Sequence, residues 1–132
     1  MIFKTGDKFE RSFTVTEPVY NGFIKTFRDN NPLHTDDRYA KYYGFSEKVM
    51  HGNILNGFLS FFIGECLPVK NVVIHLQEIQ FKNPVYLNDA LSFQAVVSDI
   101  SEAVNTVEFK FSFTNADGKL VSKGKIQIGI LT

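Results

Sequence analysis

Residues that can carry acid–base chemistry lie close together near the end of the first quarter of this sequence. Asp29 and His34 are the titratable pair, and Asn31 and Pro32 stand between them. A histidine near its ordinary pKa of ~6.5 exchanges protons at neutral pH, and a carboxylate beside it can orient a water molecule or donate a proton. Because proline pushes the preceding residue out of the helical region, the Asn31-Pro32 turn can bring both side chains into one pocket. We predict that Asp29 and His34 form a catalytic pair.

The same residues also have an ordinary structural explanation. Asp29 can cap a turn, Asn31-Pro32 can end a helix, and His34 can be a solvated loop residue. On these residues alone the structural explanation is favoured, so the choice between it and a catalytic pair depends on other segments of the chain.

A long apolar run follows, and we expect a helix over His51–Leu67 that is apolar on most of its circumference and therefore surrounded by protein. The N-terminus of a helix leaves backbone N–H groups without internal partners, and these groups suit negative charge. We predict that the N–H of Gly52 or of Asn53 binds a substrate oxygen. Gly57 permits close approach of a backbone or ligand. His51 is expected to be structural.

The rest of the chain alternates in the way that strands do. A Phe-rich run near residue 110 alternates cleanly, and Asn115–Gly118 is a strong hairpin turn. Thr16 followed by Glu17-Pro18 is a helix start. Including the long helix, the expected elements in order are strand Lys8–Thr16, helix Glu17–Arg28, helix Asp36–Tyr43, helix His51–Leu67, and strands Val72–Phe81, Ala90–Ile100, Thr106–Thr114 and Lys119–Leu131.

Long alternating strands after a largely apolar helix predict a curved antiparallel sheet wrapped around that helix. We therefore expect an α+β fold in a single domain over residues 1–132, a length typical of one domain. Such a sheet leaves an edge strand, and pairing with a second subunit is one way to cover it. We expect a homodimer or a higher homo-oligomer.

Composition excludes several classes of partner. Fourteen basic and fourteen acidic residues cancel, so we expect no nucleic-acid partner, because phosphate neutralisation normally requires a basic excess. The N-terminus lacks the layout of a signal peptide, and no stretch reaches the ~20 apolar residues that span a bilayer. We expect a cytoplasmic protein without a membrane partner. The single cysteine, Cys66, is expected to be a small buried hydrophobe.

Several segments together resemble the MaoC-like, or R-specific, enoyl-CoA hydratases. They are D-N-N-P-L-H-T-D from residue 29, the following Y-A and G-F pairs, H-G-N-I-L from residue 51, and F-K-N-P-V-Y-L-N-D from residue 81. The resemblance covers nearly the whole chain. It implies the hot-dog fold, a long antiparallel sheet wrapped around a central helix, with dimers that form through the sheets. It also implies an acyl thioester substrate, carried by coenzyme A or acyl carrier protein.

The activity implied by the resemblance is hydration of trans-2-enoyl thioesters to (R)-3-hydroxyacyl thioesters, or the reverse dehydration. Asp29 and His34 match the family's catalytic pair, and Asn31 matches an asparagine held within its loop. The N–H groups at the start of the long helix would stabilise negative charge on the thioester oxygen. The predicted substrate-binding residues are Gly52, Asn53, Asn31 and Gly57.

Some positions depart from the family pattern. Asn53 stands where methionine is common, Asn56 and Gly57 occupy a region where a serine or another residue helps to shape the site, and Asn88 stands where glycine is common. These departures leave the acid–base pair intact and bear on substrate preference.

Two other functions fit the same fold. One is a thioesterase, in which the carboxylate activates water against the thioester carbon, and the other is a non-catalytic module that binds acyl thioesters. No cofactor is expected. The three histidines lack metal-ligand spacing, which argues against a zinc site; they are His34, His51 and His75.

Overall fold

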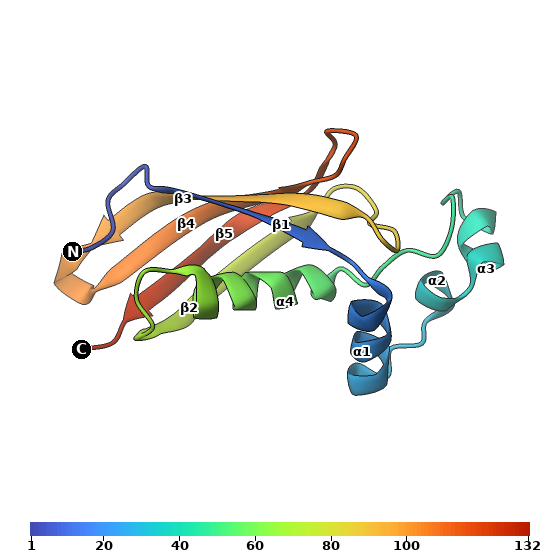
Figure 1. The fold of residues 1–132 in the computed structure, drawn as a ribbon, viewed down its shortest axis with the longest axis horizontal. Coiled ribbons are helices and arrows are strands. Elements are labelled where there is room, and N and C mark those ends of the chain that lie inside the picture. Colours follow the sequence, from blue (N-terminus) through green and yellow to red (C-terminus); the bar gives the residue numbers. More distant parts are fainter.

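An antiparallel sheet of five strands forms one layer of the molecule, and the computed structural model describes every residue from Met1 to Thr132. The strand order is β1-β3-β4-β5-β2, so the first two strands along the chain form the two edges. The sheet curves over helix α4 (Asn53–Phe61), which runs along its concave side (Figure 1). The strands are β1 (Lys8–Thr14), β2 (Val72–Phe81), β3 (Ala90–Ser101), β4 (Thr106–Thr114) and β5 (Leu120–Ile130).

The predicted α+β architecture and all five strands are confirmed, with strand ends within two residues of the predicted ones. The alternation of apolar and polar residues predicted these strands, because successive side chains of a strand point to opposite faces of the sheet. In β4, Val107, Phe109, Phe111 and Phe113 are all buried. Phe109 meets Phe62 after α4 at a centroid distance of 5.8 Å, edge to face. This phenylalanine-rich layer joins the sheet to the helix.

Helix α1 (Glu17–Phe27) lies near one end of α4, as Figure 1 shows. It begins where predicted, because Thr16 caps it: the Thr16 Oγ1 accepts a hydrogen bond from the Val19 N–H at 3.4 Å. It ends at Arg28, which has a left-handed backbone (φ 60°) and donates its N–H to the last turn. This left-handed residue redirects the chain, so that Asp29 leaves the helix.

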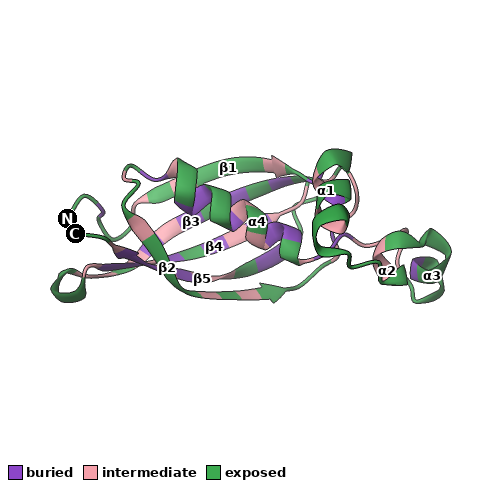
Figure 2. Ribbon diagram, turned by 90° about the horizontal axis from the view of Figure 1, so that it is seen from below, coloured by how far each residue is buried: buried purple, intermediate pink, exposed green.

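Two short helices follow and project beyond the end of the sheet (Figures 1 and 2). Helix α3 (Asp37–Tyr42) lies within the predicted range Asp36–Tyr43 and is capped by Asp36. Helix α2 (Pro32–Thr35) is a single turn that we did not predict. Pro32 cannot continue a helix from the residues before it, but the fixed φ of proline suits the first position of a new helix.

The central helix is shorter than the predicted His51–Leu67, because α4 gives way to a π-helical turn at Phe62–Cys66. The prediction that protein surrounds it on most sides is wrong for the single chain. Its far face, including Gly57, is open, and Phe61 is 51% exposed. Figure 2 shows this exposed face of α4 in front of the sheet. The buried residues of the run are His51, Ile54, Leu55, Leu59, Phe62, Ile63 and Leu67.

The edge strand β2 carries apolar side chains that remain exposed. It pairs with β5 along one side only. Four of its large apolar residues are between 37% and 52% exposed: Val73, Ile74, Leu76 and Phe81. An unpaired apolar edge of this kind is a surface for pairing with another chain.

Two other sequence expectations concern single features. Cys66 is half-buried against the core rather than fully buried, and the Arg11 Nε–H donates to its Sγ at 3.3 Å. No helix in the structure is both long enough and apolar enough to cross a membrane.

Candidate active site

Asp29 is held by its backbone, which leaves its side chain accessible. The Asp29 carbonyl accepts a hydrogen bond from the Nε2–H of His51 at 2.9 Å. The Asp29 Oδ1 accepts another from the Asn31 N–H at 3.2 Å, in the manner of an Asx turn. The second carboxylate oxygen has no partner within the chain, and the residue is exposed. Asp29 therefore presents a carboxylate on a fixed backbone.

His34 lies on α2, and its neighbours determine which ring nitrogen carries the proton. Its Nδ1 is 2.7 Å from the Val49 carbonyl, which can only accept, so Nδ1 bears the hydrogen. The Nε2 of neutral His34 therefore carries a lone pair, and it has no partner in the chain. The Val49 N–H also donates to the Leu33 carbonyl at 2.9 Å. His34 is thus clamped to a neighbouring segment with its basic nitrogen available.

A buried phenol supports the same turn. The Tyr20 hydroxyl donates to the His34 carbonyl at 2.5 Å. Burial raises the pKa of Tyr20, and the negative charge of Asp37 raises it further, so the phenol stays a donor at neutral pH. Helix α1 therefore helps to place His34.

Asn31 organises the loop between Asp29 and His34. Its Oδ1 accepts from the Leu33 N–H at 3.0 Å and caps α2, and its carbonyl accepts from the Thr35 hydroxyl at 3.2 Å. These bonds shorten the path between Asp29 and His34. Substrate contact by Asn31 stays a prediction.

His51 is buried, with 3% of its surface exposed. Burial lowers the pKa of His51 from its ordinary value of 6.5; the hydrogen bond to the Asp29 carbonyl and the Asp29 charge oppose this shift, and His34 adds to it. A neutral ring that donates through Nε2 has its lone pair on Nδ1, which finds no partner. His51 fits the structural role that we expected, because it holds the backbone of Asp29.

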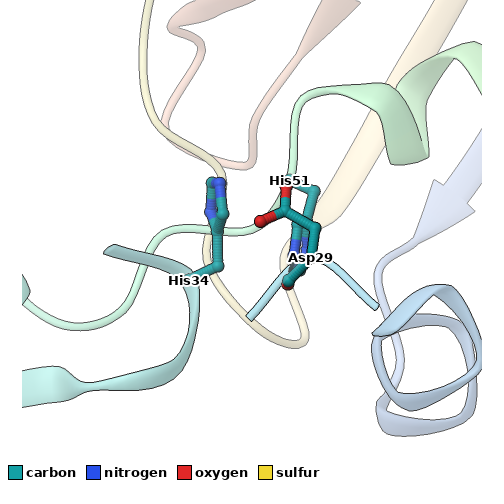
Figure 3. Close-up of side chains that lie close together, drawn as sticks. All are labelled: Asp29, His34 and His51. Atoms are coloured by element: carbon teal, nitrogen blue, oxygen red, sulfur yellow. Dashed lines mark hydrogen bonds between the residues drawn. The ribbon is translucent and has the colours of Figure 1, made fainter. Parts of the chain in front are cut away.

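Asp29, His34 and His51 come together at one point of the molecule. One carboxylate oxygen of Asp29 and one ring nitrogen of each histidine lie within 4.8 Å of one another, and Figure 3 shows the Asp29 carboxylate beside the two rings. Three such side chains can suggest a metal site. The two imidazoles, however, are stacked at a centroid distance of 4.1 Å and an angle of 30°. Lone pairs lie in the plane of each ring, and two stacked rings are poorly placed to direct theirs at one ion, which argues against a metal site.

The N-terminus of α4 begins beside this cluster. The N–H groups of Gly52 and Asn53 make no hydrogen bond within the chain, as the helix start predicts. A Cβ at Gly52 would lie 2.8 Å from the Phe81 ring, so a larger residue there would force that ring to shift. The Phe81 ring therefore packs closely against the start of α4. The two backbone donors nevertheless remain available.

Two clefts meet at this helix start. The first, which we call the α1–α4 cleft, has a volume of about 790 Å³. Its apolar walls come from Val19, Phe23, Phe27, Ile54 and Phe58, and its polar residues are Asp29, Asn53 and Asn56. The second, the His34 cleft, has a volume of about 460 Å³ and includes His34, Gly52, Asn53, Phe81 and Lys82. Asn53 is the one residue that lines both.

The remaining predicted residue, Gly57, also lines the α1–α4 cleft. A Cβ at Gly57 would meet no atom within 4 Å, so no packing within the chain requires this glycine. Sequence reasoning missed the supports of the site. Val49 orients His34 and Gln77 bonds to Asn56, and both contacts join residues far apart in the chain without a local signal.

Comparison with known proteins shows which family the sequence matches. The sequence model of the MaoC-like domain family matches residues 3–116. An (R)-specific enoyl-CoA hydratase of Rhodospirillum rubrum is 28% identical over 125 residues, which cover 95% of this chain and 86% of that protein. A mitochondrial 3-hydroxyacyl-[acyl-carrier-protein] dehydratase of Arabidopsis thaliana is 25% identical over 127 residues, which cover 94% of this chain and 75% of that protein.

Solved structures share the fold. An R-hydratase of Pseudomonas aeruginosa matches with a TM-score of 0.86 and 28% identity, over 97% of this chain and 82% of that chain. An (R)-hydratase of Aeromonas caviae matches with a TM-score of 0.89 and 24% identity, over 98% of both chains. The predicted hot-dog fold is confirmed. With a family match over most of its length and this fold, the chain belongs to the MaoC-like domain family.

Proposed function

We propose that this chain is a hydratase/dehydratase that interconverts trans-2-enoyl and (R)-3-hydroxyacyl thioesters, with Asp29 and His34 as its acid–base pair. One observation carries the proposal. A carboxylate oxygen of exposed Asp29 lies within 4.8 Å of a ring nitrogen of His34, whose Nδ1–H is bound by Val49, and both lie beside the N-terminus of a helix. The relatives named as hydratases and dehydratases support the reaction class.

In the hydration direction, one water molecule supplies both groups that are added. The water is held between the His34 Nε2 and the Asp29 carboxylate. As its oxygen bonds to C3 of the enoyl group, the pair takes up one water proton. The electron pair of the C2–C3 double bond moves onto the thioester, and C2 then receives a proton from the Asp29 carboxyl. The pair ends in the protonation state in which it began, and dehydration is the reverse.

Negative charge develops on the thioester oxygen during this addition. The N–H groups of Gly52 and Asn53 are the donors that we assign to it, because neither has a partner within the chain. Fixed donors of this kind stabilise a transition state by roughly 3–4 kcal/mol when they are aimed at the developing charge. Gly52 lines the cleft that contains His34, so the donor and the base share one site.

The α1–α4 cleft is our proposed acyl site. It is mostly apolar and contains Asp29, so an acyl chain in it would begin beside the acid–base pair. Gly57 adds room on the helix side, since no atom of the chain fills the space above it. Coenzyme A and acyl carrier protein both present their acyl groups as thioesters, and we propose either as the carrier.

A panel of trans-2-enoyl-CoA substrates of increasing chain length tests the proposal. The loss of the conjugated double bond is followed optically, and chiral chromatography identifies the product. We expect an (R)-3-hydroxyacyl-CoA product and almost no turnover by Asp29→Asn. Release of free thiol from saturated acyl-CoA would indicate a thioesterase instead. Tight binding without turnover at every chain length would indicate a binding module, and either result would reject the proposal.

We further propose that two chains pair along β2 to form a homodimer. The outer edge of β2 has no strand beside it, and its exposed side chains are largely apolar. Pairing would satisfy the backbone groups of that edge and remove apolar surface from water.

Sedimentation equilibrium tests this assembly. We expect twice the mass of one chain for the wild type, and dissociation by Val73→Lys, which places a charge on the exposed edge strand. Val104→Lys is the matched control, since Val104 is 66% exposed outside the sheet. A monomeric wild type, or equal behaviour of both variants, would reject the proposed interface.

A further inference from the structure

Three side-chain amides form a hydrogen-bonded chain from edge strand β2 to the first turn of α4. The Gln77 Nε2 donates to the Asn56 Oδ1 at 2.5 Å, and the Asn56 Nδ2 donates to the Asn53 Oδ1 at 2.8 Å. Asn53 and Asn56 share one face of the helix, because residues three apart are neighbours on a helix surface. The three amides make no other side-chain hydrogen bond within the chain.

The direction of these bonds leaves mainly donors on the helix. Both asparagine oxygens already accept a hydrogen bond, whereas Asn53 retains two N–H groups and Asn56 retains one. Asn53 and Asn56 both line the α1–α4 cleft. The cleft therefore combines an apolar wall with amide N–H groups that have no partner in the chain.

A purely alkyl occupant would fit this cleft poorly. It would displace water from the amide N–H groups and offer them nothing in return, and a desolvated donor without a partner is destabilising. An occupant with an oxygen acceptor at the same depth would satisfy the donors and still fill the apolar part. We infer that the acyl group of the preferred substrate carries an oxygen acceptor beyond the thioester, bound by Asn56 and Asn53. This inference rests on the proposed function, which places the acyl group in this cleft.

The spacing along α4 indicates where that acceptor lies. The thioester oxygen is assigned to the N–H groups at the helix start, and Asn56 is three residues beyond Asn53. At a rise of about 1.5 Å per residue, this separation is roughly 4.5 Å along the helix axis. A ketone at C4 or C5 of the acyl chain can reach the Asn56 amide from there.

Gln77 acts as a positioning residue in this arrangement. It does not line the cleft, but its bond occupies the Asn56 oxygen and so turns the Asn56 N–H groups away from β2. Removing the Gln77 amide would leave Asn56 able to rotate and would weaken, without abolishing, the preference for an oxygen acceptor.

Calorimetric titration with saturated acyl-CoA probes tests the inference, because such probes bind but cannot be hydrated. The matched pairs are pentanoyl-CoA with 4-oxopentanoyl-CoA, and hexanoyl-CoA with 5-oxohexanoyl-CoA. We expect the better-placed ketone to bind about tenfold tighter than its alkyl counterpart, the effect of satisfying one otherwise desolvated donor.

Variants identify the residues responsible. Asn56→Leu has a similar size but no donor, and it should abolish the preference for the ketone; Gln77→Leu should reduce it. Asn21→Leu on α1 and Gln80→Leu on β2 are matched controls at exposed positions outside the cleft, and they should keep it.

Equal affinities within both probe pairs, failure of every probe to bind, or an undiminished preference in Asn56→Leu would overturn the inference. These outcomes are separable from failure of the proposed function. Hydration of simple enoyl-CoA substrates with equal probe affinities would reject only the inference. A ketone preference in a protein that hydrates no enoyl thioester would reject only the hydratase.

Discussion

Strands β3 and β4 and the segment from Asp29 to Asn53 differ in whether their polar groups have hydrogen-bond partners within the chain. In the strands, backbone groups pair along the register except at a shift between Val97 and Asp99, and alternate side chains are buried. In the segment, the His34 Nε2 and the backbone N–H groups at the start of α4 have no partner within the chain. Satisfied, buried groups stabilise the fold, and unpartnered groups near solvent are available to a ligand. We therefore expect stability and the proposed chemistry to depend on different regions, so substitutions should separate them.

The largest expected effect is the loss of turnover in His34→Ala. Removing a general base typically lowers the rate by 10²–10⁴-fold, and we expect about 10³-fold here. Because His34 is only partly buried, the melting temperature of the variant should stay close to that of the wild type. Steady-state kinetics and thermal unfolding of the same sample measure both. A variant that is unfolded, or that turns over substrate at the normal rate, would contradict the separation of stability from chemistry.

Phe109→Ala should show the opposite behaviour. Phe109 is fully buried and packs against Phe3, Phe9 and Phe62. Truncating such a ring costs about 3–5 kcal/mol of unfolding free energy, which urea titration can measure. At a temperature where the variant is folded, turnover per folded molecule should be unchanged. The exposed neighbour provides the control, Lys110→Ala, for which we expect almost no change.

A smaller effect is expected where the segment from Asp29 to Asn53 meets the edge strand β2. In Gly52→Ala the new Cβ would lie 2.8 Å from the Phe81 ring, which must shift. Overpacking of this kind costs about 1–3 kcal/mol, and the low end applies because Phe81 is half exposed. Adding Phe81→Leu should recover most of the lost unfolding free energy. If the double variant is no more stable than Gly52→Ala, the packing explanation for this glycine is wrong.

The smallest effect is a pH dependence of stability that comes from His51. Its pKa is lowered in the folded protein, so below about 6.5 the unfolded chain binds more protons than the folded one. The stabilisation is complete above pH 6.5 and is lost as the pH falls toward the folded pKa. His51→Gln keeps an amide donor for the Asp29 carbonyl but does not titrate. Urea unfolding at pH 7.5 and pH 5.5 should therefore show a smaller drop in His51→Gln than in the wild type; equal drops would exclude His51 as the source.

Local sequence signals were sufficient for the strands and for most helix ends. The strands alternate, Thr16 and Asp36 cap the helices that follow them, and these features act within a few residues. The exposure of α4 could not be read in the same way. A run that is apolar all round predicts burial, but whether one layer or two covers it depends on how many chains assemble.

The sequence pointed to the candidate acid–base pair but not to the contacts that support it. Asp29 and His34 are close in sequence, so their spacing suggested a pair. The proton position on His34 depends on Val49, fifteen residues away, and the amide chain depends on Gln77, twenty-one residues from Asn56. Such contacts are set by the tertiary fold, and side-chain types alone carry no signal for them.

A double-mutant cycle in the hydration rate tests the central claim most directly. It compares kcat/KM for Asp29→Asn, for His34→Ala and for the variant with both changes. Because both residues act on one water molecule, the double variant should be about as slow as the slower single variant. Losses that multiply would show that the two side chains act independently, and turnover that survives both substitutions would place the chemistry elsewhere; either result would contradict the account.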